Sequence, residues 1–327
     1  MGDSRFVRDV VGMFLLMLTI VVFAGATLVP RSLWFVDFET HEALGVDVSR
    51  PFVKTSEDVL GGAKEPWRGI KVKGNVEADF IYATLLGGDI VSFGFSRLRS
   101  VVLPIEPTST GYRLLDINVL RNRGYIYMAD WLENAQKLWE ERRTEKAETR
   151  FSRVIERLNY NNLLSIQNPR KKYVLLYNAS GTNIAACVIQ REQLPSFEIL
   201  QTMVKPRGYI ADSKSFYYET SDENEAHFIC SILNSKVLNE AIKPLQPRIL
   251  FGEREIQRRP FMFPIPKFDK TNSKHVELAQ ISKQCHNRLK SKQFRSKSAA
   301  GARSEARKIV AREIERVDEL VSELLGL

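Results

Sequence analysis

The chain has 327 residues, a formal net charge of +9 at pH 7 and a sequence pI near 9.4. A hydrophobic content of 44% is enough for a folded core, so the composition excludes a wholly disordered chain, and the length suits about two domains. The charge favours a polyanionic partner, nucleic acid before a membrane surface, although a solvated basic surface has the same composition. The three cysteines, Cys187, Cys230 and Cys285, show no disulfide or metal spacing, which favours a reducing compartment and a cytoplasmic location.

An uncharged stretch at residues 10–29 is the first feature in chain order. A run of about twenty such residues is long enough to span a bilayer. Arg5 and Arg8 precede it, and Ala24-Gly25-Ala26 resembles a signal-peptidase site. By hydropathy alone this stretch predicts a membrane helix or a signal sequence.

The first half of the chain continues with short elements. A buried strand is predicted over residues 32–38, a short helix over 78–86, and strands over 90–95 and 100–105. Residues 130–159 predict one long helix, whose charged centre is typical of a solvated surface. We interpret this helix as a spacer between two halves.

A hairpin opens the second half, with strands predicted at 173–177 and 184–189 around a polar turn. Lysine and arginine can neutralise phosphates, and asparagine and serine can contact base edges. The same residues also suit an ordinary surface hairpin. The candidate DNA-binding residues here, with three basic positions further along, are Arg170, Lys171, Lys172, Asn178, Ser180, Asn183, Lys205, Arg207 and Lys214.

The stretch from Gly208 to Pro266 contains a strand or hairpin, and then a helix that starts at Asp222 and ends at Pro244. A basic loop and a short edge strand at 261–266 follow, since the prolines there exclude a central strand. The loop adds four candidate DNA-binding residues, Arg248, Arg254, Arg258 and Arg259.

The C-terminal part predicts a helix at 273–289 and a basic stretch at 290–307, either disordered or tracking DNA. The last helix has apolar residues at heptad spacing from Val310 to Leu324. This seam is short, so docking on the body or on a partner helix is expected.

The order of these segments resembles the target-recognition domains of adenine-specific DNA methyltransferases of restriction-modification systems, in particular the type IIG kind, and of type I specificity subunits. Residues 25–36, residues 172–183, Ile232-Leu233-Asn234-Ser235 and Pro264-Ile265-Pro266 carry the resemblance, which spans roughly residues 24 to 290. It implies an α+β fold of mixed sheets with a helical spacer and C-terminal helices. It also implies that the chain from Gly25 onward is a strand of a folded domain, which opposes the membrane interpretation.

Adenine methyltransferases also need a glycine-rich S-adenosylmethionine loop and an Asn/Asp-Pro-Pro-aromatic tetrapeptide that grips the flipped base. The sequence has neither, and Asn168-Pro169-Arg170-Lys171 lacks the second proline and the aromatic residue. We therefore expect no catalytic residue, no metal ligand and no cofactor in this chain, and no activity of the chain alone. The resemblance places S-adenosylmethionine in a separate or missing catalytic domain.

The resemblance implies sequence-specific recognition of double-stranded DNA beside a methyltransferase domain or subunit. Two alternatives are a membrane-anchored protein with a basic cytosolic domain and a non-functional gene fragment. The expected division is an apolar segment at 1–23, a first recognition part at 24–128, a helical spacer at 129–159, a second α/β part at 160–268 and C-terminal helices at 269–327.

Overall fold

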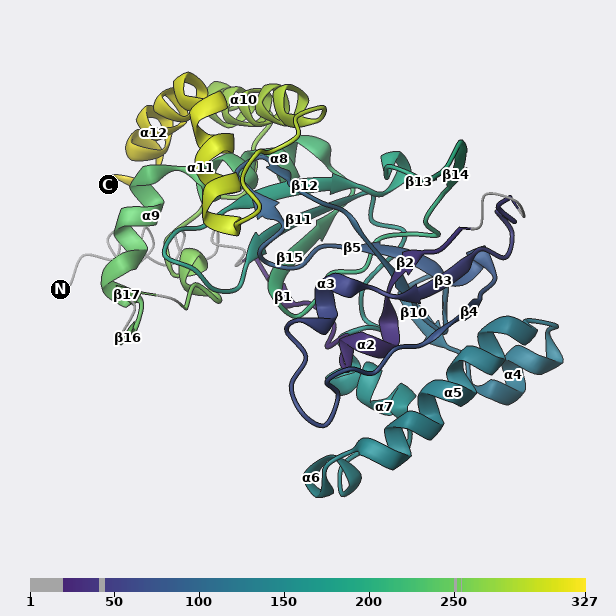
Figure 1. Ribbon diagram of the computed structural model, residues 1–327. Coiled ribbons are helices and arrows are strands. Elements are labelled where there is room, and N and C mark those ends of the chain that lie inside the picture. The colour runs from purple at the N-terminus through teal and green to yellow at the C-terminus, as the bar shows by residue number, and fades with distance from the viewer. Residues whose placement is uncertain (1–19, 41–44, 250–251, 254) are drawn as a thin grey trace.

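The computed structural model describes residues 20–40, 45–249, 252–253 and 255–327. Within these ranges the chain forms two larger antiparallel sheets, each with helices packed against it (Figure 1). This mixed arrangement confirms the predicted α+β class.

The first sheet has five strands in the order β4-β3-β2-β8-β5. Their bounds are β2 (Phe35–Phe38), β3 (Phe52–Thr55), β4 (Lys73–Asn75), β5 (Ile81–Thr84) and β8 (Arg99–Val102). Buried side chains of this sheet share a hydrophobic core with helix α5 (Ile126–Arg142). On that helix, Trp131 Nε1 donates a hydrogen bond to the Leu33 carbonyl at 3.1 Å, which joins the helix to the residues just before β2.

Two predictions in this sheet are wrong in part. Residues 32–38 do not form one strand, because a short helix, α2 (Arg31–Trp34), precedes β2. Residues 78–86 are not helical beyond a 3-10 turn at Ala78–Phe80, and β5 follows. All four residues of β5 are buried, so the strand lacks the polar-apolar alternation that marks a half-exposed strand.

The prediction of one long spacer helix over residues 130–159 is also wrong, since three helices occupy that stretch. They are α5, α6 (Glu145–Glu148) and α7 (Val154–Leu158). The first ends at Arg142, because the next residue, Arg143, has an extended backbone, and the Thr144 hydroxyl then caps α6. The Arg143 guanidinium donates to the carbonyls of Phe151 and Ser152 at 3.1 and 3.0 Å. These bonds connect the end of α5 to the residues just before α7.

The second sheet has four strands in the order β1-β15-β11-β12. Their bounds are β1 (Phe23–Ala24), β11 (Tyr173–Asn178), β12 (Ala186–Gln190) and β15 (Ser215–Thr220). The pairing of β11 with β12 confirms the predicted hairpin. β1 brings residues from the apolar N-terminal stretch to the edge of this sheet, where Phe23 lies opposite Tyr217.

Part of the apolar stretch, up to residue 19, lies outside the described residues. In the described ranges, no helix has both the length and the apolar character needed to cross a bilayer. From Val22 onward the stretch includes buried residues, among them Ala26 and Leu28.

Helix α8 (Glu223–Asn234) begins where the sequence predicts, because the Asp222 carboxylate accepts hydrogen bonds from the Asn224 and Glu225 amides. It does not continue to Pro244. Ser235 has an extended backbone and its hydroxyl caps a second helix, α9 (Lys236–Ile242). The Asn234 amide at the end of α8 exchanges two hydrogen bonds with the backbone of Ala186, at 3.0 and 2.8 Å, and so pins the helix end to β12.

The predicted edge strand at 261–266 is wrong. A 3-10 turn at Arg259–Met262 and irregular chain occupy the stretch. Pro260, Pro264 and Pro266 remove backbone donors that a ladder would need. Strands β16 (Arg248–Ile249) and β17 (Gly252–Glu253) form a small hairpin before it.

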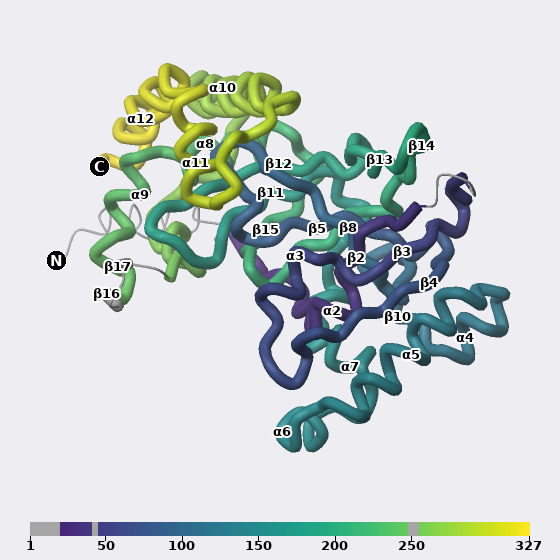
Figure 2. Tube along the Cα trace, in the orientation of Figure 1, coloured from purple at the N-terminus to yellow at the C-terminus, as the bar shows by residue number. Residues whose placement is uncertain are grey.

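Helix α8 packs on the second sheet, and three C-terminal helices lie around it, as Figures 1 and 2 show in yellow-green to yellow. They are α10 (Ser273–Leu289), α11 (Ala299–Ile309) and α12 (Ala311–Leu325). The helix at 273–289 is confirmed, whereas the basic stretch at 290–307 contains most of α11. Ile314, Val317 and Val321 of α12 are buried in the core shared with α8 and α10, so the heptad seam docks on the body.

The smaller elements complete the chain. They are α3 (Glu57–Leu60), β6 (Ile90–Val91), β7 (Gly94–Phe95), β9 (Ile105–Pro107), β10 (Tyr112–Leu114), α4 (Ile117–Asn122), β13 (Phe197–Ile199) and β14 (Thr202–Val204), with short 3-10 turns between elements. The predicted strand at 90–95 is thus the tight β6–β7 hairpin, and the one at 100–105 is divided between β8 and β9.

Residues 208–215, which we call the central segment, connect the two sheets. Ala83 of β5 exchanges hydrogen bonds with the Gly208 carbonyl and the Ile210 amide at 2.8 and 2.9 Å. On the other side, the Ala26 amide donates to the Ala211 carbonyl at 2.7 Å. The expected domain boundaries stay predictions, although β1 places residues 23–24 in the second sheet.

Gly25 lies against the central segment, and this position tests whether the N-terminal stretch belongs to the fold. A Cβ there would collide with the Asp212 carbonyl oxygen, whereas a Cβ at Gly61 meets nothing within 4 Å. We expect Gly25→Ala to lower the free energy of unfolding by about 1–3 kcal/mol, since backbone must shift. Gly61→Ala, at a helical backbone, should change it by less than about 1 kcal/mol. Urea unfolding of both variants measures this, and equal stabilities would contradict the placement of Gly25.

Candidate nucleic-acid interface

The turn of the β11–β12 hairpin is built around a buried asparagine. Asn178 Nδ2 donates to the carbonyls of Ser180 and Asn183 at 2.9 and 3.1 Å, and its Oδ1 accepts from the Ala185 amide at 2.8 Å. Its side chain is fully buried, so its polar atoms serve the turn and do not face solvent. Ser180 and Asn183 are exposed on the outside of the same turn.

Two further loops lie against this turn. The Ala179 amide donates to the Lys214 carbonyl at 3.0 Å, and the Ala179 carbonyl accepts from the Ile256 and Gln257 amides at 3.2 and 3.1 Å. The side chains of Lys214 and Arg258 are exposed on these loops. We call residues 179–183, Lys214 and residues 255–259 the turn surface.

Within the basic loop, Arg259 has a structural role. Its Nε donates to the Leu245 carbonyl at 2.6 Å and its Nη1 to the Glu255 carbonyl at 2.8 Å. The Glu255 carboxylate lies 3.8 Å away, so this arginine is held inside its own loop. Arg254 and the side chain of Arg248 lie outside the described residues.

The other candidates lie away from the turn surface. Arg170, Lys171 and Lys172 precede β11, and six strand residues, roughly 20 Å, separate them from the turn. The Lys172 ammonium also pairs with Glu192 at 3.2 Å. Lys205 and Arg207 lie near Asp79, and Arg207 pairs with it at 3.0 Å. The structure therefore brings together Ser180, Asn183, Lys214 and Arg258, and leaves the basic triplet elsewhere.

Arg303 and Arg307 of α11 approach the same turn. Both belong to the basic stretch 290–307, for which disorder or DNA tracking was expected, but neither is among the individual candidate residues. Arg303 Nε donates to the Ile90 carbonyl at 2.9 Å and its Nη2 to the Gly87 carbonyl at 2.6 Å. A Cβ at Gly181 would lie 3.3 Å from Arg303 Nη1, so glycine leaves room for the guanidinium. Spacing of four residues places both arginines on one helix face, the signal that could have revealed them.

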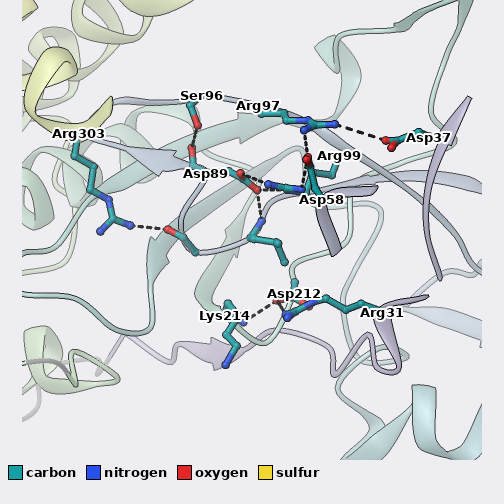
Figure 3. A network of polar contacts seen from close by, with 12 residues as sticks. Arg31, Asp37, Asp58, Asp89, Ser96, Arg97, Arg99, Asp212, Lys214 and Arg303 are labelled. Atoms are coloured by element: carbon teal, nitrogen blue, oxygen red, sulfur yellow. Dashed lines mark hydrogen bonds and ion pairs between the residues drawn. The ribbon is translucent and has the colours of Figure 1, made fainter. Parts of the chain in front are cut away.

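Burial also marks these two arginines. It lowers the pKa of Arg303, and it lowers the pKa of Arg307 against the opposing effect of the nearby Asp318. Figure 3 shows Arg303 directed at a backbone carbonyl, with Lys214 in the same view. Neither guanidinium forms an ion pair within 4 Å in the described part of the chain, and partial removal from water leaves positive charge that an anion would offset.

A second group of arginines in Figure 3 differs, because carboxylates neutralise it. Arg99 binds Asp89 through two hydrogen bonds of 2.6 and 2.8 Å and reaches Asp58 at 3.2 Å. Arg97 lies 3.6 Å from Asp37. These arginines stabilise the loops around β8 and add little net positive charge.

The buried Asp212 is paired with an arginine and a backbone amide. Asp212 accepts from Arg31 Nη2 at 3.0 Å and from the Lys214 amide at 2.9 Å, and burial raises its pKa. Across the described ranges, no group of three or more His, Cys, Asp or Glu side chains could hold a metal ion.

No protein-family model and no curated protein matches the chain. Among solved structures, the type IIL restriction-modification enzyme MmeI in complex with DNA gives a TM-score of 0.52 at 10% identity, over 93% of this chain and 32% of that one. The chain shares the fold of that part of the enzyme. At this identity the likeness concerns the fold alone.

The type IIG restriction endonuclease BpuSI gives a TM-score of 0.34 at 13% identity, over 97% of this chain and 33% of that one. That score is too low for an argument from fold. The chain spans about a third of the length of both enzymes.

Asn178 and Asn183 form a matched pair for separating turn structure from DNA contact. We expect Asn178→Ala to lower the free energy of unfolding by about 1–3 kcal/mol, because it leaves buried backbone groups without partners. Asn183→Ala, on an exposed side chain, should change it by less than about 0.5 kcal/mol. Thermal and urea unfolding check this. An Asn178→Ala variant of unchanged stability but altered DNA sequence preference would show that Asn178 reads bases.

Proposed function

We propose that the chain is the DNA-recognition part of an adenine-specific DNA methyltransferase of a restriction-modification system. Its role is to hold duplex DNA and read the target while a separate domain or subunit, which binds S-adenosylmethionine, transfers the methyl group. The observation that carries this proposal is the fold likeness over 93% of the chain to a restriction-modification enzyme solved in complex with DNA.

The turn surface supports the proposal in its chemistry. It combines the exposed cations Lys214 and Arg258 with the hydroxyl of Ser180 and the amide of Asn183. Cations suit phosphates, and hydroxyl and amide groups suit base edges. The loops that carry them are joined by backbone hydrogen bonds at Ala179, so the groups are held in a defined relation to one another.

The division of labour follows from the residues that the chain lacks. The sequence contains no glycine-rich cofactor loop and no Asn/Asp-Pro-Pro-aromatic tetrapeptide. A methyl transfer therefore needs a second domain, whether on a separate subunit or on a longer chain. In this proposal the present chain supplies affinity and specificity, and the partner supplies cofactor and catalysis.

A direct test measures both halves of the proposal on the purified full chain. We expect binding to duplex DNA that weakens steeply with salt, because the contacts include phosphates. We expect no heat of binding with S-adenosylmethionine in calorimetry and no methyl transfer to DNA. The proposal fails if the chain binds no duplex at low salt, or if the chain alone methylates DNA.

The location of the interface is tested by a pair of double variants. Lys214→Ala with Arg258→Ala should weaken DNA binding and lower the salt slope by about 0.9 for each lost phosphate contact. The control, Lys172→Ala with Arg207→Ala, removes the same charge from positions that pair with carboxylates away from the turn. Fluorescence anisotropy across a salt series measures both. Equal losses would mean that net charge, and not the turn surface, governs binding.

A further inference from the structure

A cleft of about 510 Å³ lies between α11 and the hairpin turn, and we call it the arginine cleft. Arg303, Arg307, Lys308 and Lys236 line it together with hydroxyl and amide side chains. Among the described residues, its lining includes no Asp or Glu. Four other clefts of this chain each have at least one carboxylate in the lining. The arginine cleft therefore differs from them in having no carboxylate in its lining to offset its cations.

The two arginines of the cleft are incompletely neutralised. Arg303 is held by the carbonyls of Gly87 and Ile90, which are dipoles and carry no net charge. Arg307 has one weak hydrogen bond, of 3.4 Å, to the Ser92 hydroxyl. The carboxylate of Asp318 accepts from the Lys236 amide at 2.6 Å and lies 3.9 Å from its ammonium, so it is already engaged.

The chemistry of the lining selects a phosphate-type ligand. Guanidinium groups bind phosphate oxygens through paired hydrogen bonds, and hydroxyl and amide donors complete such sites. The hydroxyl of Thr182 and the amide of Asn183 belong to both the cleft and the turn surface. A phosphate in the cleft would thus be continuous with a polyanion lying on the turn surface.

We propose that the arginine cleft binds a backbone phosphate of the duplex that the turn surface holds. Its donors would be Arg307 and Nη1 of Arg303, which has no hydrogen-bond partner among the described residues. This inference rests on the proposed function, and it adds α11 to the interface. Such a contact fixes the position of the protein along the duplex and carries no base preference of its own.

The test compares Arg307→Ala with Arg312→Ala, an exposed arginine of α12 that does not line the cleft. Arg307→Ala should weaken binding of the full chain to several unrelated duplexes alike, by roughly tenfold. It should also lower the salt slope by about 0.9. Arg312→Ala should change the affinity by less than about twofold, as an exposed charge that is screened by salt. Thermal unfolding should show that both variants fold, since the only hydrogen bond of the Arg307 side chain within the described ranges is the weak one to Ser92.

A second pair of variants leaves Arg307 in place, so a loss of binding cannot come from a structural effect of removing it. Ser304 is exposed and lines the cleft, so Ser304→Glu introduces a carboxylate, and Ser304→Gln is its uncharged control. We expect Ser304→Glu to lose DNA affinity and Ser304→Gln to keep it. Inorganic phosphate, added at constant ionic strength, should compete with DNA on the wild-type chain and not on Arg307→Ala.

The outcomes separate this inference from the proposed function. If the wild-type chain binds DNA and Arg307→Ala and Ser304→Glu retain its affinity and salt slope, the inference is overturned and the function stands. Inorganic phosphate that binds the cleft without affecting DNA binding would show a site for free phosphate, which also overturns it. A wild-type chain that binds no duplex overturns both.

Discussion

The structure depends on the backbone of the central segment being hydrogen-bonded on both of its sides. Buried peptide groups need partners, and here the partners come from three distant parts of the chain. Ala83 of the first sheet binds one side, and Ala26 of the N-terminal stretch binds the other. The side-chain amide of Gln167 is the third partner. Its Oε1 accepts from the Ala211 amide at 2.8 Å, and its Nε2 donates to the Ala211 carbonyl at 3.0 Å. Removing any one of these partners would leave buried polar groups unsatisfied.

This constraint also positions the candidate interface. The central segment runs from the first sheet past Asp212 to Lys214, whose carbonyl binds the hairpin turn. Asp212 is fully buried, and its pairing with Arg31 opposes the rise in pKa that burial causes. The turn surface is therefore hydrogen-bonded to the central segment, which also connects the two sheets. Loops on such a rigid support can present side chains to a ligand at defined positions.

The arginines of this chain have different roles because their surroundings differ. Arg99 and Arg259 make contacts within the fold. Arg99 pairs with carboxylates, and Arg259 donates to backbone carbonyls. Arg303 and Arg307 lie on α11 beside the hairpin turn, where their hydrogen-bond acceptors are carbonyls and a hydroxyl. Among the described residues, neither forms an ion pair, although Asp318 lies near Arg307. Net charge alone therefore does not identify a nucleic-acid surface. The cations available to bind an anion are those that the fold has not paired with a carboxylate.

The sequence by itself determined the features that depend on neighbours along the chain. The Asp222 cap of α8, the β11–β12 hairpin and the helix at 273–289 follow from local spacing and capping chemistry, and the structure confirms them. The α+β class and the likeness in fold to part of a restriction-modification enzyme also agree with the order of segments.

Only the tertiary structure decided the features that depend on distant partners. The break at Ser235 is stabilised by the Asn234 contact with β12, and the burial of Asn178 follows from the closed turn. The meeting of Lys214 and Arg258 with the hairpin turn, and the placement of α11 against it, need contacts across long sequence separations. Local patterns carry no information about such contacts, because the residues that make them are specified independently in the sequence and meet only in the fold.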